Sequence, residues 1–174
     1  TVINNPTIAV VGGSICVGQQ TITLTANSNA TNFTWSPATG LSATTGNSVT
    51  ASPSSIGPNT YTIVGTTGSC TVSTTATVTV YALPVPTAST NVPCETENPL
   101  NLTCSATPTA TYTYNWSGPN SFSSTSQNPS ITTLNNVTQA VAGTYTVLVT
   151  DNNSSYNTTT VSVVVNTKPD VTAT

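Results

Sequence analysis

Hydrophobic and polar residues alternate with a period of two in several short runs of the chain. The clearest runs are residues 21–26 (TITLTA), 75–80 (TATVTV), 145–149 (YTVLV) and 159–165 (TTVSVVV). This period predicts β-strands that bury one face and expose the other. No stretch has the apolar spacing of an amphipathic helix. The pattern therefore predicts an all-β protein.

Clusters of glycine, proline, asparagine and serine separate these runs. They lie at residues 37–40, 57–59, 66–69, 118–120 and 151–155, and such residues favour turns. The turns leave about seven short strands in each half of the chain, with one tryptophan in the third run. We therefore predict two tandem immunoglobulin-like antiparallel β-sandwich domains in an extended array.

Three similar segments punctuate the chain: VINNPTIA from Val2, VYALPVPTA from Val80 and VNTKPDVTA from Val165. In each, a valine precedes a proline by four residues. Because proline cannot donate to the centre of a sheet, we interpret each segment as a last strand, a linker and the first strand of the next domain. The predicted divisions are 1–5 (end of a preceding repeat), 6–82 (sandwich 1), 83–166 (sandwich 2) and 167–174 (start of a following repeat).

The two halves match in order, and the matching residues predict the two cores. Trp35 corresponds to Trp116 and Tyr61 to Tyr145, and we expect these four to anchor the cores. A platform for stacking sugars is the alternative role for the tryptophans. The predicted inward-facing residues are Ile22, Leu24, Trp35, Tyr61, Ile63, Val78 and Val80 in the first domain, and Leu100, Leu102, Trp116, Tyr145, Val147, Val149, Val161 and Val163 in the second.

The amino-acid composition argues against two classes of partner, nucleic acids and membranes. Charged residues make up 3% of the 174 residues, and the net charge is −3. With one lysine and no arginine, nucleic-acid binding is not expected, because that affinity comes from basic side chains. No apolar run approaches the roughly 20 residues of a membrane helix, so membrane insertion is not expected. The chain starts with threonine and lacks methionine, which suggests a processed or excised piece.

The four cysteines predict disulfide bonds, and strands rich in threonine and valine suit an extracytoplasmic protein where such bonds persist. Within-domain pairing of Cys16 with Cys70 and of Cys94 with Cys104 is the favoured scheme. Zinc is the alternative, but it prefers closely spaced Cys and His residues, and the chain has no C-x-x-C and no histidine. Cys104 precedes Trp116 at an antibody-like spacing, yet Val147 occupies the partner position, which excludes a bond across that core.

Two segments resemble the immunoglobulin-like and PKD-like repeats of Bacteroidota cell-surface proteins. They are CVGQQTITLTA…FTWSPATGLSATTG…VTASP…TYTIVGTTGSCT and YNWSGPNSFSSTSQNPSITT…AGTYTVLVTD. The resemblance implies secreted stalks and adhesins, including gliding-associated surface proteins, in which such repeats act as spacers. Members of this family usually pair an early cysteine with one after the sixth strand, and the second domain departs from that pattern.

Catalysis is not expected, because an acid, a base or an activated nucleophile must lie within reach of another. Histidine is absent, and the carboxylates fall in turns or near the ends of the chain. Structural calcium is a weak alternative at Glu95-Thr96-Glu97 or Asp151-Asn152-Asn153, where ordinary turn formation is the simpler role. Lys168 lies in a predicted linker, so neither domain can form an internal isopeptide crosslink. No cofactor is expected.

Surface glycosylation is the chemistry that the sequence leaves open. N-x-S/T sequons are frequent, although a chain this rich in Asn, Thr and Ser carries several by chance. A further sequon at Asn115 adjoins a core tryptophan and is the least suitable. The candidate sites are Asn29, Asn32, Asn101, Asn136, Asn152, Asn153 and Asn157.

Three functions follow as hypotheses. The first is a non-catalytic structural segment of a secreted, extracellular or cell-surface stalk, fibre or adhesin, with further repeats or copies of the chain as partners. The second is a carbohydrate- or surface-binding module that uses exposed aromatic residues such as Phe122 or Tyr156. The third is ice binding through threonine rows such as Thr75/Thr77/Thr79 and Thr21/Thr23/Thr25, which is also how the solvent face of a strand looks.

Overall fold

The computed structural model describes residues 5–95, 99–132 and 138–169. The chain divides into two compact units, residues 1–83 (unit 1) and 84–174 (unit 2). Over these described ranges, strands make up the regular structure of both units, apart from the single-turn 3₁₀ segments η1 (Pro119–Ser121) and η2 (Gln139–Val141). The predicted all-β class is confirmed.

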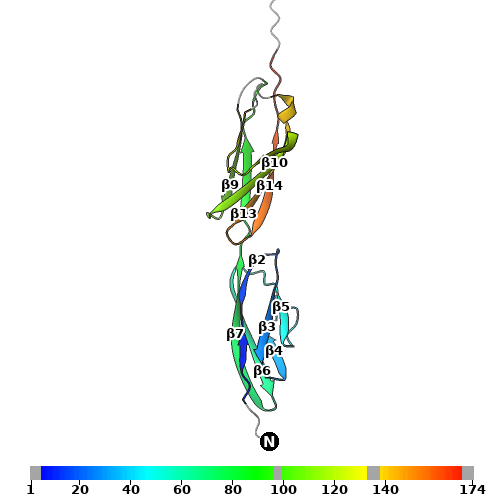
Figure 1. Ribbon diagram of the computed structural model, residues 1–174, viewed down its shortest axis with the longest axis vertical. Helices are drawn as coiled ribbons and strands as arrows, with labels where there is room; N and C mark the ends of the chain where they lie inside the picture. Colours follow the sequence, from blue (N-terminus) through cyan, green and yellow to red (C-terminus); the bar gives the residue numbers. More distant parts are fainter. Residues whose placement is uncertain (1–4, 96–98, 133–137, 170–174) are drawn as a thin grey trace, which may run out of the picture. The chain divides into compact units, whose positions relative to one another are not determined.

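Unit 1 is a sandwich of two sheets (Figure 1). One sheet has the order β1-β3-β5 and the other β2-β7-β6-β4. Every pairing is antiparallel except that of β2 with β7, which is parallel. The strands are β1 (Ile8–Val10), β2 (Gly13–Cys16), β3 (Ile22–Ser28), β4 (Asn32–Ser36), β5 (Ser48–Ala51), β6 (Gly57–Thr67) and β7 (Cys70–Tyr81).

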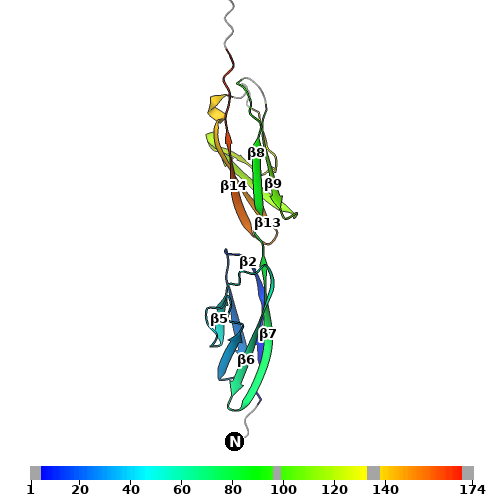
Figure 2. The ribbon, with the colours of Figure 1, turned by 180° about the vertical axis from the view of Figure 1, so that it is seen from behind.

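Unit 2 repeats this plan, with sheets in the order β12-β9-β8 and β11-β10-β13-β14 (Figure 2). All the pairings between its strands are antiparallel. The strands are β8 (Val85–Thr90), β9 (Leu100–Thr107), β10 (Tyr112–Gly118), β11 (Phe122–Ser124), β12 (Ser130–Ile131), β13 (Gly143–Asp151) and β14 (Tyr156–Val163).

The alternation of the sequence sets which face of each strand is buried. Along β6 and β13, every second residue from Tyr61 and Tyr145 onward is buried, and its neighbours are more exposed. Each unit has its own core of these inward side chains. The predicted inward-facing residues are confirmed as buried, except that Ile22 and Val161 are only partly buried at the edges of the cores.

The first strand of unit 1 is split so that it serves both sheets. β1 pairs with β3, and β2 then pairs with β7. Gly12 lies at the switch, where a Cβ atom would come within 2.0 Å of the carbonyl oxygen of Thr77. A glycine is therefore required for the two backbones to approach this closely.

In unit 2 the first strand also passes from one sheet to the other, but its parallel pairing with the second sheet is shorter than in unit 1. After β8 leaves the first sheet, Cys94 forms a parallel bridge with Asn166. Two backbone hydrogen bonds accompany it, from Asn166 to Pro93 (3.1 Å) and from Glu95 to Asn166 (2.8 Å).

Candidate functional site

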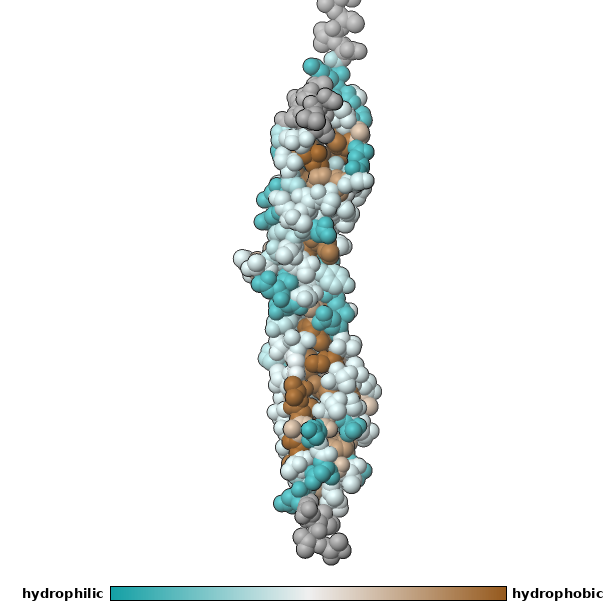
Figure 3. All heavy atoms as spheres, in the orientation of Figure 1, coloured by the Kyte–Doolittle hydropathy of each residue, from teal (hydrophilic) through white to brown (hydrophobic). Residues whose placement is uncertain are grey.

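Hydroxyl and amide groups dominate the surface that both units present. In Figure 3 most of the visible surface has intermediate or hydrophilic hydropathy, and the apolar areas are narrow. On β6 and β7, Thr60 and Thr77 face each other across the strands with their hydroxyl oxygens 3.2 Å apart. Thr25 and Ser48 make a similar contact at 3.1 Å. The threonine rows are therefore the solvent faces of the sheets.

The carboxylates that the sequence offered for chemistry do not form a cluster. Within the described ranges, no group of three or more His, Cys, Asp or Glu side chains could hold a metal ion. The carboxylate of Asp151 accepts hydrogen bonds from the backbone N–H groups of Asn153 (2.8 Å) and Ser155 (2.9 Å). This is the ordinary turn-forming role of aspartate. Glu97 and Asp170 lie outside the described residues.

The two tryptophans are core anchors, as predicted. Trp35 and Trp116 are 3% and 0% exposed. Each indole N–H donates to a backbone carbonyl eleven residues later, Trp35 to Gly46 (2.9 Å) and Trp116 to Gln127 (3.3 Å). Each ring thus fills a core and fixes the loop beside it. Burial leaves neither ring available as a platform for sugars.

The two tyrosines are also buried anchors. Tyr145 donates to the carbonyl of Val141 (2.9 Å), four residues upstream, which is a tyrosine corner. Gly143 forms this corner with a φ of 137°, a region that favours glycine. Tyr61 instead donates to Thr39 (2.9 Å), twenty-two residues upstream. Burial raises the pKa of both phenols, so both hydroxyls remain donors at neutral pH.

The predicted disulfide bonds are wrong for this structure. Cys16 lies opposite Tyr81 at one end of the twelve-residue strand β7, and Cys70 begins that strand at the other end. At about 3.3 Å per residue the two are roughly 35 Å apart, whereas a disulfide needs Cα atoms about 4.4–6.8 Å apart.

The cysteines of unit 2 are not brought together either. Cys104 lies opposite Ala88 on β8, while Cys94 lies beyond the end of β8, opposite Asn166. The Cys104 thiol is buried and donates to the carbonyl of Ser105 (3.7 Å), and burial raises its pKa. The Val147 position, which the sequence assigned to an apolar core, is fully buried.

The candidate glycosylation sites differ in how far their amide groups are already engaged. Asn152 and Asn153 lie exposed in the turn between β13 and β14. The side-chain N–H of Asn157 donates to the carbonyl of Pro84 (3.1 Å), and that of Asn32 donates to the Thr31 hydroxyl (3.3 Å). Asn29 and Asn101 are exposed on unit 1 and unit 2, as is Asn115 on the outer face of β10. Asn136 lies outside the described residues.

The aromatic residues proposed as sugar contacts have different surroundings. Phe122 is partly buried, and its ring meets that of Tyr145 edge-to-face at 5.4 Å and 71°. It belongs to the core of unit 2. Tyr156 is half exposed at the start of β14.

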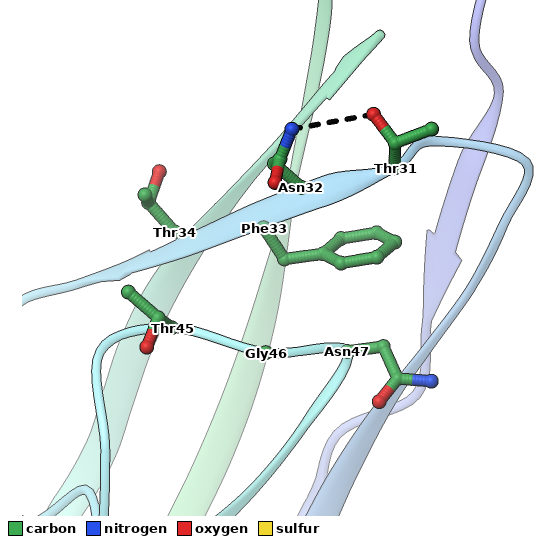
Figure 4. A pocket seen from close by; sticks show the side chains of 7 residues that line it. All are labelled: Thr31, Asn32, Phe33, Thr34, Thr45, Gly46 and Asn47. Carbon is green, nitrogen blue, oxygen red and sulfur yellow. Dashed lines mark hydrogen bonds between the residues drawn. The ribbon is translucent and has the colours of Figure 1, made fainter.

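The structure contains a hollow that the sequence did not reveal. It lies in unit 1 between β4 and a loop, is lined by residues 31–34 and 45–47, and has a volume of about 590 Å³ (Figure 4). Phe33 lines it with its ring, and polar side chains surround the ring. The spacing of Phe33 from Trp35 marks it as inward-facing, but only the position of the loop shows that its ring borders a hollow.

No helix in the described part of the chain is long and apolar enough to cross a membrane. No protein-family model matches the sequence, and no curated protein matches it. Solved structures do match.

Extracellular domains 3–5 of Drosophila OTK are 13% identical, with a TM-score of 0.54 over 94% of this chain and 63% of that chain. The N-terminal eight Ig domains of Down Syndrome Cell Adhesion Molecule (DSCAM) isoform 1.30.30 are 14% identical. Their TM-score is 0.60 over 91% of this chain and 27% of that chain. The chain thus spans less than two thirds of either structure. At these identities the likeness concerns the fold, and both units have the immunoglobulin-like β-sandwich fold.

Proposed function

We propose that the chain is a non-catalytic structural segment of a secreted bacterial cell-surface stalk, fibre or adhesin. The observation that carries this proposal is the repetition of one sandwich plan in two consecutive units, each with a separate apolar core. A repeat of this kind adds length to a protein without needing a reactive site.

The connection between the units supports this role. β7 ends at Tyr81 and β8 begins at Val85, so three residues join the last strand of one unit to the first strand of the next. Linkers this short are typical of tandem arrays in which each domain follows the last directly. The partners on this proposal are further repeats, or copies of the chain in a fibre.

The surface supports a location outside the cell. With 3% charged residues, it relies on hydroxyl and amide groups for hydration. The similarity of both units to Bacteroidota surface repeats favours a bacterial source. Electron microscopy of the native assembly, with gold-labelled antibodies against this chain, tests the proposal. Label along extracellular fibres or stalks is expected, and label confined to isolated globules would contradict it.

We also propose that glycans cover part of this surface. Asn152 and Asn153 are accessible candidate sites, because both are exposed in a turn. The measurement is mass spectrometry of the proteolytic peptides that cover the candidate asparagines, prepared from the native protein. Peptide masses that exceed those of the bare sequence by whole sugar units are expected, and masses equal to those of the bare sequence at every candidate site would contradict the proposal.

A further inference from the structure

The hollow beside Phe33 has walls that are fixed before any ligand arrives. One wall is β4, which pairs with β6 along its whole length. The facing loop is held by the buried Trp35, whose backbone N–H donates to Thr44 (2.8 Å) and whose indole N–H donates to Gly46 (2.9 Å). The backbone N–H of Ala26 fixes the end of the loop by donating to Asn47 (2.8 Å). A preformed site loses little entropy on binding.

The lining combines one aromatic ring with uncharged polar groups. Phe33 is partly buried, and its ring edge lies near Gly65 of β6. Asn32 and Asn47 are exposed at the rim, together with threonine hydroxyls. Among the described residues the side chain of Asn47 has no hydrogen-bond partner, so its donors and its acceptor can face a ligand. The described residues that line the hollow carry no charge.

Unit 2 has a different arrangement at the corresponding place. Gln127 takes the position of Gly46, since each accepts from the tryptophan of its own unit. The side chain of Gln127 donates to the carbonyl of Cys104 (2.7 Å), and that of Asn128 accepts from the N–H of the same residue (3.0 Å). In unit 1 a glycine takes the place of Gln127, and Asn47, which corresponds to Asn128, is exposed.

This chemistry selects a class of ligand. A sugar presents C–H groups that pack on an aromatic face, and hydroxyls that both donate to and accept from amides. An anionic ligand would need a cation, and the chain's single lysine, Lys168, belongs to the other unit. The volume of about 590 Å³ falls within the range of about 300–1,000 Å³ typical of small-ligand sites.

We propose that this hollow binds a neutral saccharide of one or two sugar units, packed on Phe33 and hydrogen-bonded by Asn32 and Asn47. The proposal adds a glycan-binding site to a chain whose structural role does not depend on one. Loss of sugar binding would leave the electron-microscopy result unchanged, so the two proposals can fail separately.

The test is a titration of the full ¹⁵N-labelled chain with neutral disaccharides, followed through its backbone amide signals. The probes are maltose, cellobiose, lactose, mannobiose and diacetylchitobiose, with N-acetylneuraminic acid and glucuronic acid as anionic comparators. We expect saturable shifts at residues 31–34 and 45–47 with at least one neutral probe, and none with the anionic probes.

Three variants locate the contact. Asn47→Ala removes an exposed side chain that has no hydrogen-bond partner in the described part of the chain, so the variant should fold. Loss of its hydrogen bonds to the sugar should weaken binding at least tenfold. Phe33→Leu keeps most of the apolar volume while removing the ring, and should weaken binding similarly. Asn101→Ala, at an exposed asparagine of unit 2, is the matched control and should bind as the parent does.

The outcomes that overturn the proposal are equally specific. They are the absence of saturable shifts with every neutral probe, shifts that fall outside the hollow, and unchanged affinity in Asn47→Ala. Binding of the anionic comparators alone would also overturn it, because the ligand would then be of another class.

Discussion

Unit 1 and unit 2 build the same sandwich with different local contacts. In both, a buried tryptophan and a buried tyrosine lie on neighbouring strands of the larger sheet. In unit 2 the tyrosine hydroxyl bonds Val141 within its own turn, whereas in unit 1 it bonds Thr39 in a loop far upstream. The fold therefore requires a partner for a buried phenol, and several segments of backbone can supply one.

The centres of the two cores differ as well. Unit 2 buries Cys104 and Val147, and the corresponding residues of unit 1 are Ala26 and Ile63, also buried. In neither unit do two cysteines face each other at these positions. Apolar packing fills the place that a disulfide holds in antibody domains, so the stability of each unit should depend strongly on its large core side chains.

Removing a tryptophan should have the largest effect. Trp116→Ala should lower the free energy of unfolding of unit 2 by about 3–5 kcal/mol, and Trp35→Ala should do the same to unit 1. Because each unit has its own core, each loss should stay within its unit. Urea unfolding of the full chain, followed by amide signals assigned to each unit, measures this. Equal losses in both units from either variant would show that the cores are not independent.

The two units differ at the second residue after the buried tryptophan, which is Gly118 in unit 2 and Pro37 in unit 1. A Cβ atom on Gly118 would lie 2.3 Å from the ring of Tyr145. Gly118→Ala should therefore destabilise unit 2 by about 1–3 kcal/mol through overpacking. Asn115→Ala, on the exposed face of the same strand, is the control and should change stability by less than about 0.5 kcal/mol. Similar stabilities of the two variants would contradict the tight fit at Gly118.

The two tyrosine hydroxyls should not be equally important. Tyr145→Phe leaves the carbonyl of the buried Val141 without its partner, which should cost about 1–3 kcal/mol. Tyr61→Phe releases the carbonyl of Thr39, an exposed residue that water can reach, so about 0.5–1 kcal/mol is expected. Chemical denaturation of both variants measures the difference. A larger loss of unfolding free energy from Tyr61→Phe than from Tyr145→Phe would contradict the placement of the buried tyrosine corner in unit 2.

Alkaline pH should distinguish the units by a smaller effect. Burial raises the pKa of Tyr145, Tyr114 and Cys104 in unit 2, and that of Tyr61 in unit 1. For Tyr114 the nearby Cys104 and Tyr112 add to the effect of burial. A raised pKa in the folded state stabilises it below the unfolded pKa, and this contribution is lost as pH rises through the folded pKa.

With unfolded pKa values of about 8.5 for cysteine and about 10 for tyrosine, these groups should leave stability unchanged between pH 6 and pH 8. Above about pH 9, stability should fall more steeply for unit 2 than for unit 1. Urea unfolding monitored by methyl NMR signals of each unit provides the measurement. An equal or steeper decline in unit 1 would contradict the burial of these groups in unit 2.

The periodic pattern was sufficient to predict the fold class and most of the large side chains of both cores, but it missed core residues such as Ile15, Val49 and Val141. Tyr61, Tyr145 and the valines beside them lie in strands where every second residue is buried, and period two is a local property of the sequence. The disulfides could not be predicted in this way, because pairing depends on which end of a strand each cysteine occupies. Cys16 and Cys70 are compatible in sequence order, yet they lie at opposite ends of β7.

The hollow at Phe33 was missed for a similar reason. Its second wall comes from residues 45–47, in the loop that follows the end of β4 at Ser36, and this loop is held by the hydrogen bond from Trp35 to Gly46. No spacing rule identifies such a loop in advance. The correspondence between Gln127 and Gly46 is likewise seen only in the structure, where each accepts a hydrogen bond from the tryptophan of its own unit.

The most direct test of a structural role is the force at which each unit opens when the chain is pulled from its ends. In unit 1 the parallel strands β2 and β7 share four residue pairs, which such a pull would shear. In the described part of unit 2, one bridge lies at that place, between Cys94 and Asn166. Single-molecule force spectroscopy should therefore show two opening events at different forces. Trp116→Ala should lower the force of the weaker event further, which would assign that event to unit 2. Events of equal force, or a unit 2 that opens after unit 1, would contradict the account.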